Sequence, residues 1–91
     1  MERRLVFVLL DGLNAGTARR CMSYMQALCQ AGQARYHELT ALLPPLSRPL
    51  YATLLSGLEP AATGIVRNDD VRLCPAPTFF HQAQTAGLIT A

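Results

Sequence analysis

The chain has 91 residues, of which 51% are hydrophobic and 15% are charged, and its formal net charge is +2. This length allows one small domain, and this composition excludes a disordered chain. The weak charge, with no basic run and no alternation of aromatic and basic residues, argues against a nucleic acid polymer as partner. The apolar run from Leu5 to Leu10 ends at Asp11, too early for a signal core or a membrane span. We therefore expect a soluble, cytoplasmic domain with no membrane partner.

Cysteine usage excludes two kinds of structural cross-link. The three cysteines, Cys21, Cys29 and Cys74, are odd in number and follow no regular spacing. A disulfide framework needs paired cysteines, and a structural zinc site needs closely spaced Cys or His pairs that this chain lacks. We expect all three to be ordinary buried residues.

The first half of the chain predicts a strand, a helix and a second strand. Residues 4–10 form a continuous apolar run, typical of a strand buried on both faces of a parallel sheet, and the sequence "DGLN" then predicts a turn. Apolar residues at helical spacing predict a helix over residues 17–31, which Gly32 would end. A second strand is expected within residues 35–43, before the break at "PPLS".

The second half predicts two helices and the start of a third strand. A short helix over residues 48–56 would end at Gly57, a loop would follow over 59–78, a helix over 78–86, and a strand would begin in "LITA". The alternation of strands and helices predicts an α/β fold, with right-handed crossovers and a parallel sheet with helices on its faces. Because the sequence stops as a strand begins, we expect residues 1–91 to be the amino-terminal β-α-β-α-β portion of a larger domain.

Asp11 is the first candidate for chemistry. It follows the first predicted strand directly, and open α/β sheets bind their ligands at the carboxyl ends of strands. A carboxylate at this position can ligate a metal ion, or it can accept hydrogen bonds from turn amides. The residues around Asp11 leave both interpretations open.

Ser47 is the second candidate, because it stands where the short helix is expected to start. Backbone N–H groups and the helix dipole favour an anion at a helix start, which would place a phosphate in front of the Ser47 hydroxyl. Serine is also a favoured N-cap residue, which gives a purely structural interpretation. Arg48 offers the same choice, since it can bind a phosphate or be solvated.

Three stretches together resemble the type I phosphodiesterase/nucleotide pyrophosphatase family of the alkaline phosphatase superfamily. The stretch "VFVLLDGL" is similar to the family's first strand with its metal-binding aspartate, which maps to Asp11. The stretch "PPLSRPLYATLLSGLEPAATGIVRND" resembles the family's nucleophile segment: Ser47 lies ten residues before Gly57, and Pro49 lies two residues after Ser47. The last stretch, "FFHQAQTAGLITA", is similar to the helix and strand that follow.

This resemblance implies a fold, a reaction and a metal site. The fold would be the three-layer α/β/α arrangement, with helices on both faces of the sheet. The protein would be a metal-dependent hydrolase of phosphate esters or nucleotide pyrophosphates, with two divalent metal ions, usually zinc. Asp11 and Ser47 would ligate metal, Ser47 would be the catalytic nucleophile that attacks phosphorus, and Arg48 would bind the phosphate.

The resemblance also implies that the chain is incomplete. The family's other metal ligands would lie downstream of Ala91, and a catalytic zinc usually has three protein ligands of its own. We therefore expect a single fragment, residues 1–91, that is inactive alone and that associates with itself or with another segment of the same protein. A second hypothesis is a non-catalytic α/β interaction piece in which Ser47 is only a helix cap.

Overall fold

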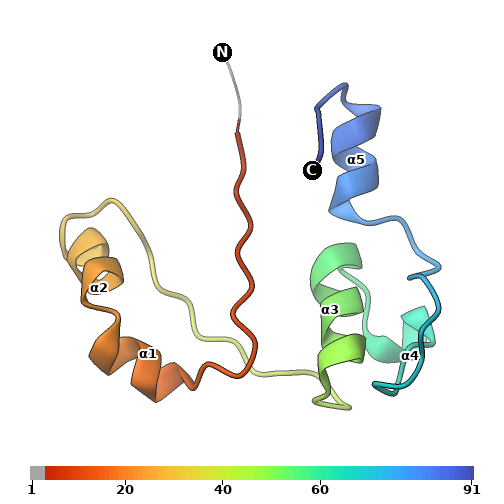
Figure 1. Cartoon of the computed structure of the whole chain (residues 1–91), viewed down its shortest axis with the longest axis horizontal. Coiled ribbons are helices and arrows are strands. Elements are labelled where there is room, and N and C mark those ends of the chain that lie inside the picture. The colour runs from red at the N-terminus through yellow and green to blue at the C-terminus, as the bar shows by residue number, and fades with distance from the viewer. Residues whose placement is uncertain (1–3) are drawn as a thin grey trace. The chain divides into compact units, whose positions relative to one another are not determined.

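The computed structural model describes residues 4–91, and the chain divides into two compact units, Met1–Glu38 and Leu39–Ala91. Across residues 4–91 the structure has five helices and no strand (Figure 1). The first unit holds α1 (Ala15–Cys21) and α2 (Ser23–Gln30). The second holds α3 (Ser47–Ser56), α4 (Pro60–Thr63) and α5 (Phe79–Thr85).

The prediction of an α/β fold with a parallel sheet is therefore wrong for residues 4–91. The segments 4–10, 35–43 and 88–91 have the composition of strands but form no strand in the structure. A strand exists only where a second strand supplies its ladder of hydrogen bonds, and strand propensity mainly records how well a side chain packs against such neighbours. Without a ladder, the apolar side chains of the first segment stay exposed, at 81% for Leu5 and 83% for Val6.

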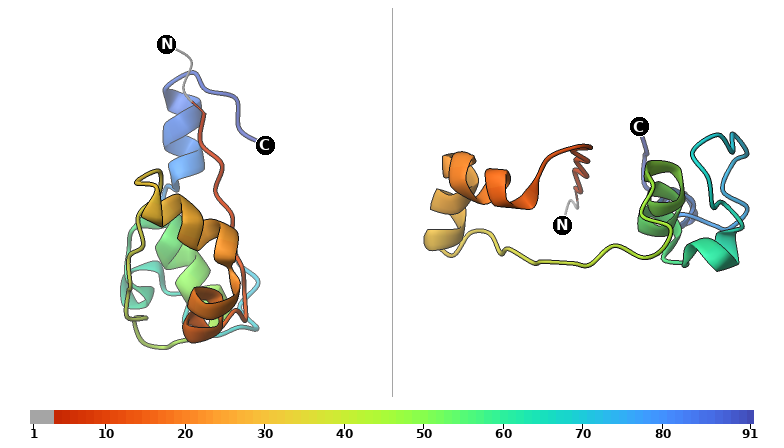
Figure 2. Two further views of the ribbon diagram at one scale, coloured as in Figure 1. Left: turned by 90° about the vertical axis from the view of Figure 1, so that its left-hand side faces the viewer. Right: turned by 90° about the horizontal axis from the view of Figure 1, so that it is seen from below.

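The first unit is built on a pair of short helices rather than the single helix predicted for residues 17–31. The Asn14 side chain starts α1 by accepting a hydrogen bond from the Thr17 N–H at 3.1 Å. Met22 then leaves the helical region, with φ −89° and ψ 67°, and the ribbon bends between α1 and α2 (Figures 1 and 2). Gly32 follows the end of α2 at φ 73°, as the sequence predicts.

A polar contact holds the end of the first unit onto α1. The Arg19 Nη2 atom donates to Glu38 Oε2 at 3.0 Å, and the guanidinium lies 4.7 Å from the centre of the Tyr36 ring. The prediction that the three cysteines are buried is wrong, since Cys21 is exposed and Cys29 and Cys74 are only partly buried. No disulfide joins the cysteines, which are all free.

The second unit packs α4 and α5 against α3. Its small core contains the apolar side chains of Ala52 and Ile65, which are 5% and 2% exposed, and two fully buried prolines, Pro49 and Pro60. Gly57 ends α3 at φ 77°, the left-handed conformation that glycine adopts without a Cβ penalty. Helix α5 agrees with the helix predicted over 78–86, and α4 lies within the stretch predicted as a loop.

Candidate functional site

Ser47 is the first residue of α3 and is partly buried. The N-cap of this helix is Leu46, which has extended backbone angles of φ −115° and ψ 154° and no side-chain cap hydrogen bond. The interpretation of Ser47 as the N-cap of the helix therefore does not hold in this structure. The Ser47 hydroxyl instead stands on the first helical turn, where the positive end of the helix dipole acts.

The backbone N–H groups at the start of α3 are largely committed within the protein. The Leu46 N–H donates to Pro44 O at 2.8 Å and the Leu50 N–H to Leu46 O at 3.1 Å, while Pro49 has no N–H to offer. The Arg48 N–H donates to the Asn68 side-chain oxygen at 3.0 Å. Attraction of an anion to this helix start therefore depends on the dipole and on nearby side chains more than on a row of open amides.

Asn68 is a site residue that the sequence reasoning did not single out. Its Oδ1 atom caps the first turn of α3 from 20 residues further along the chain. The Arg48 N–H needs an acceptor, so the Asn68 side-chain amide must present its Oδ1 atom to it. The two Nδ2–H donors of Asn68 then point away from the Arg48 N–H. The signal was the asparagine at the end of "GLEPAATGIVRN", which belongs to the stretch that resembles the nucleophile segment.

Arg48 uses its side chain to bind the protein backbone. Its Nε donates to the Asp70 carbonyl oxygen and its Nη2 to the Arg72 carbonyl oxygen, both at 2.8 Å. These bonds occupy two of the five N–H donors of a guanidinium. The prediction that Arg48 binds phosphate stays a prediction.

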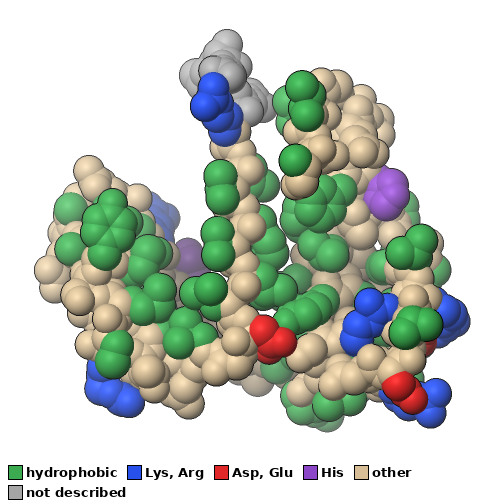
Figure 3. All heavy atoms as spheres, in the orientation of Figure 1, with side chains coloured by type: hydrophobic (Ala, Val, Ile, Leu, Met, Phe, Trp, Pro, Cys, Tyr) green, Lys and Arg blue, Asp and Glu red, His purple; other side chains and the backbone are tan. Residues whose placement is uncertain are grey.

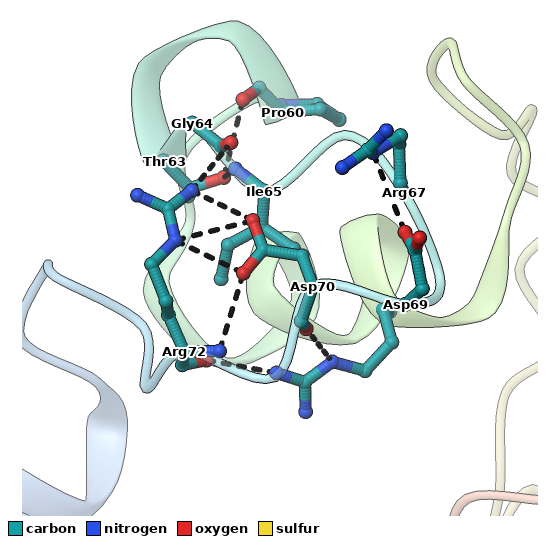
Figure 4. Close-up of polar contacts among 9 residues, drawn as sticks. Pro60, Thr63, Gly64, Ile65, Arg67, Asp69, Asp70 and Arg72 are labelled. Atoms are coloured by element: carbon teal, nitrogen blue, oxygen red, sulfur yellow. Dashed lines mark hydrogen bonds and ion pairs between the residues drawn. The ribbon is translucent and has the colours of Figure 1, made fainter.

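Asp70 and Arg72 form an ion pair that closes the same loop (Figure 4). Arg72 Nη2 lies 2.6 Å from Asp70 Oδ2, and Arg72 Nε donates to Asp70 Oδ1 at 2.9 Å. Side-chain hydrogen bonds from Arg72, helped by its backbone N–H, lower the pKa of Asp70 from 3.8 to about 2. The same pairing raises the pKa of Arg72. Both groups are therefore charged at neutral pH, and their attraction holds the loop closed.

The loop is also anchored at its start. Arg72 Nη2 donates to the Gly64 carbonyl oxygen at 3.1 Å, and Figure 4 shows the Arg72 side chain directed towards both Gly64 and Asp70. The buried Thr63 hydroxyl donates to Pro60 O at 3.2 Å and accepts the Ile65 N–H at 3.3 Å. The loop of residues 64–72 is thus tied to the end of α4 and to the start of α3 by side-chain contacts.

A cavity of about 480 Å³ lies within the second unit, between α3, α5 and the loop that joins α4 to α5. Arg48 and Tyr51 line it from α3, and His81 lines it from α5. The other lining side chains are mainly apolar and include Ala52, Leu55, Ile65 and Phe80. Ser47 precedes Arg48 in the chain but is not among the residues that line this cavity.

Asp11 lies in the first unit, in an exposed turn with Gly12 at φ 73°. The turn predicted at "DGLN" is confirmed. Asp11 and Ser47 belong to different units, so the metal-binding role of Asp11 stays a prediction.

The residues that the structure describes do not by themselves fit a binuclear zinc site. Within residues 4–91, no group of three or more His, Cys, Asp or Glu side chains is placed to hold a metal ion. Two oxygen ligands, one from Asp11 and one from Ser47, fall short of the three protein ligands usual for one catalytic zinc. We therefore assign no chemical step in this chain to a metal ion.

None of the helices in residues 4–91 has the length and apolar character needed to span a membrane, and the cytoplasmic location stays a prediction.

Comparisons with known proteins found a match to the sequence model of a protein family. No curated protein and no solved structure matched the chain. The sequence model of the type I phosphodiesterase/nucleotide pyrophosphatase family matches residues 5–86, which include Asp11, Ser47 and the loop that holds Asn68. The chain belongs to the type I phosphodiesterase/nucleotide pyrophosphatase family.

Proposed function

We propose that this chain is the nucleophile-bearing part of a hydrolase that cleaves phosphate diesters or nucleotide pyrophosphates, with Ser47 as nucleophile. The observation that carries the proposal is the family match across residues 5–86, together with the position of Ser47 on the first turn of α3. A nucleophile placed there faces an anionic substrate along the axis of the helix dipole.

The proposed reaction has two displacements. The Ser47 Oγ atom forms a bond to phosphorus as the bond from phosphorus to the leaving oxygen breaks, and the serine proton is balanced by the proton that the leaving oxygen takes up. Water then attacks the phosphorylated serine, which releases the phosphate product and restores the hydroxyl. Two easier steps replace one difficult step, which is the usual advantage of covalent catalysis.

The start of α3 offers a way to bind the charged phosphate oxygens. The Asn68 amide is fixed by its bond to the Arg48 N–H, and its two Nδ2–H donors face away from that bond. Donors that are fixed before the reaction stabilise charge that develops on the phosphate at no cost of reorganisation. We therefore add Asn68 to Ser47 as a residue of the proposed site.

The cavity beside Arg48 is a suitable place for the organic part of the ester. Its apolar side chains would bury a ring or an alkyl group, while Tyr51 and His81 add polar groups to its wall. A substrate held this way would have its phosphate at Ser47 and its leaving group over the core of the second unit.

The metal requirement and the larger domain belong to this proposal as well. We propose that Asp11 and Ser47 contribute to a centre of two divalent ions, zinc by family resemblance, completed by ligands outside residues 4–91. The chain would then be inactive alone and would act with the rest of its domain. A chelator should abolish activity of the natural protein, and zinc should restore it.

Replacing the nucleophile tests the proposal directly. In the natural full-length protein, Ser47→Ala should abolish turnover of a phosphate diester and leave the circular dichroism spectrum unchanged. Ser56→Ala is the matched control, because Ser56 ends the same helix and bonds to the backbone, with its Oγ 2.6 Å from Ala52 O. Full activity in the Ser47→Ala variant would show that Ser47 is not the nucleophile.

A non-catalytic interaction piece is the second candidate. The observation in its favour is the exposed apolar side chains of residues 4–10, such as Val6 at 83%, some of which are visible in Figure 3. Exposed apolar surface of this kind marks contact sites for other protein segments. A natural protein that shows no turnover with any phosphate ester, with or without zinc, would favour this candidate.

A further inference from the structure

Arg48 makes three hydrogen bonds to one short stretch of chain, residues 68–72. Its backbone N–H donates to Asn68 Oδ1 at 3.0 Å, and its side chain donates to Asp70 O and Arg72 O, each at 2.8 Å. Arg48 therefore binds the side chain of the first residue of the stretch and the carbonyl oxygens of the third and fifth. The loop can move away from α3 only if all three bonds break.

The chemistry of the two side-chain bonds requires arginine. A guanidinium presents its N–H donors in a rigid planar fork, so that two separated acceptors can be met at once. Asp70 O and Arg72 O are such a pair, two residues apart along the loop. A lysine ammonium carries a similar charge on a single nitrogen, and it cannot reproduce this two-point contact.

The loop is prepared for this contact by its own ion pair. Arg72 binds the Asp70 carboxylate with its Nε and Nη2 atoms and also reaches Gly64 O at 3.1 Å. Figure 4 shows the Arg72 side chain meeting the Asp70 carboxylate, and this pairing constrains the backbone between residues 70 and 72. Arg48 then joins this preformed loop to the first turn of α3.

We propose that Arg48 is a positioning residue, which fixes the Asn68 amide beside Ser47, and that its guanidinium is not a ligand of the substrate phosphate. The proposal rests on the proposed function, since it assigns Arg48 a role at the same site. A phosphate contact made by either of the two N–H groups that hold Asp70 O and Arg72 O would release a loop carbonyl and loosen the loop that positions Asn68. The side chain therefore acts on the substrate through Asn68.

A double-mutant cycle on the natural full-length protein separates positioning from direct contact. The variants are Arg48→Met, Asn68→Ala and their combination, measured by kcat, KM and inhibition by inorganic phosphate. Removing one charge-stabilising donor typically lowers kcat by about 100-fold, which we expect for Asn68→Ala. We expect Arg48→Met to lower kcat roughly tenfold, and the double variant to fall no lower than Asn68→Ala, since residues that act through one another are not additive.

Two comparisons make the outcome decisive. Arg67→Met is the matched control, because Arg67 lies in the same loop, is 75% exposed, and pairs with Asp69 at 3.3 Å; it should leave kcat and KM unchanged. Direct contact predicts a different result: the two single effects would multiply, so that kcat of the double variant falls about 1000-fold, and Arg48→Met alone would lose inhibition by phosphate. That result would overturn the proposal. An Arg48→Met variant with wild-type kcat would overturn it as well.

A measurement that needs no activity keeps the proposal separate from the proposed function. Hydrogen exchange at the backbone N–H of residue 48 should accelerate in Arg48→Met and in Asn68→Ala, and should not change in Arg67→Met. Unchanged exchange in the first two variants would refute the positioning role even if Ser47 is the nucleophile. Retained activity in Ser47→Ala would refute the proposed function and leave this result standing.

If Arg48→Met does not fold, Arg48→Lys serves in its place. Lysine keeps the positive charge that a phosphate ligand needs but loses the fork that the two carbonyls need. We expect Arg48→Lys to lower kcat and to accelerate exchange at residue 48. Wild-type kcat and phosphate inhibition in Arg48→Lys would overturn the proposal.

Discussion

Ile65 should carry a large share of the stability of the second unit. It is 2% exposed, and it joins the loop that bears Asn68 to the core beside Ala52. Replacing a buried Ile by Val typically costs about 0.5–1.5 kcal/mol, and replacing it by Ala about 2–5 kcal/mol. We expect roughly 1 kcal/mol for Ile65→Val and roughly 2–3 kcal/mol for Ile65→Ala, since the cavity that Ile65 lines gives its neighbours room to relax.

Thermal unfolding of the 91-residue chain measures this prediction. For a chain of this size, 1 kcal/mol lowers Tm by about 4–8 °C, so the two variants should be clearly resolved. Ile89 provides the matched control, because it is the same residue type and is 98% exposed; Ile89→Ala should change Tm very little. An Ile65→Ala variant with a Tm as high as that of Ile89→Ala would refute the assignment of Ile65 to the core.

Two further predictions concern pH and association. Because Arg72 lowers the pKa of Asp70 from 3.8 to about 2, the charged carboxylate stabilises the fold above about pH 4, and this contribution is lost as the pH falls towards about 2. In Asp70→Asn, the Tm should lose that part of its pH dependence; an unchanged profile would contradict the ion pair. The exposed side chains of Leu5 and Val6 should cause the chain to associate, so sedimentation should show oligomers that Val6→Lys weakens. A monomer at every concentration would contradict this.

Helices α3 and α5 of the second unit could be predicted because their signals are local, whereas α4 was predicted as loop. Gly57 ends α3 and a short apolar helix precedes it, and both features can be found in neighbouring residues. The break at Met22 carried no such signal, since Met is a good helix former and the apolar spacing continues through it. The prediction of a sheet was wrong although its local signal was strong. Residues 4–10 show the composition of a buried strand, but strand pairing depends on segments far away in the chain.

The sequence named Asp11, Ser47 and Arg48 as candidates, and their roles stay predictions, while the contacts of the candidate site came from the structure. Sequence resemblance was enough to single out Ser47, and the family match includes it. The role of Asn68 was missed because a cap is normally sought next to the helix it serves, whereas this one lies 20 residues downstream. The contacts of Arg48 with the carbonyl oxygens of Asp70 and Arg72 could not be predicted either, since every residue has a backbone carbonyl group.

The distant cap on α3 also sets an order of events during folding. Most helices obtain their first capping bond from a neighbouring residue, so that both ends can form early. Here the Arg48 N–H must wait until a loop of 20 residues has closed, which costs roughly 2–3 kcal/mol of chain entropy in addition to a constant. The carboxyl-terminal end of α3, at Gly57, needs no such closure. The helix should therefore form from Gly57 backwards, and the turn that carries Ser47 should be the last part of it to become ordered.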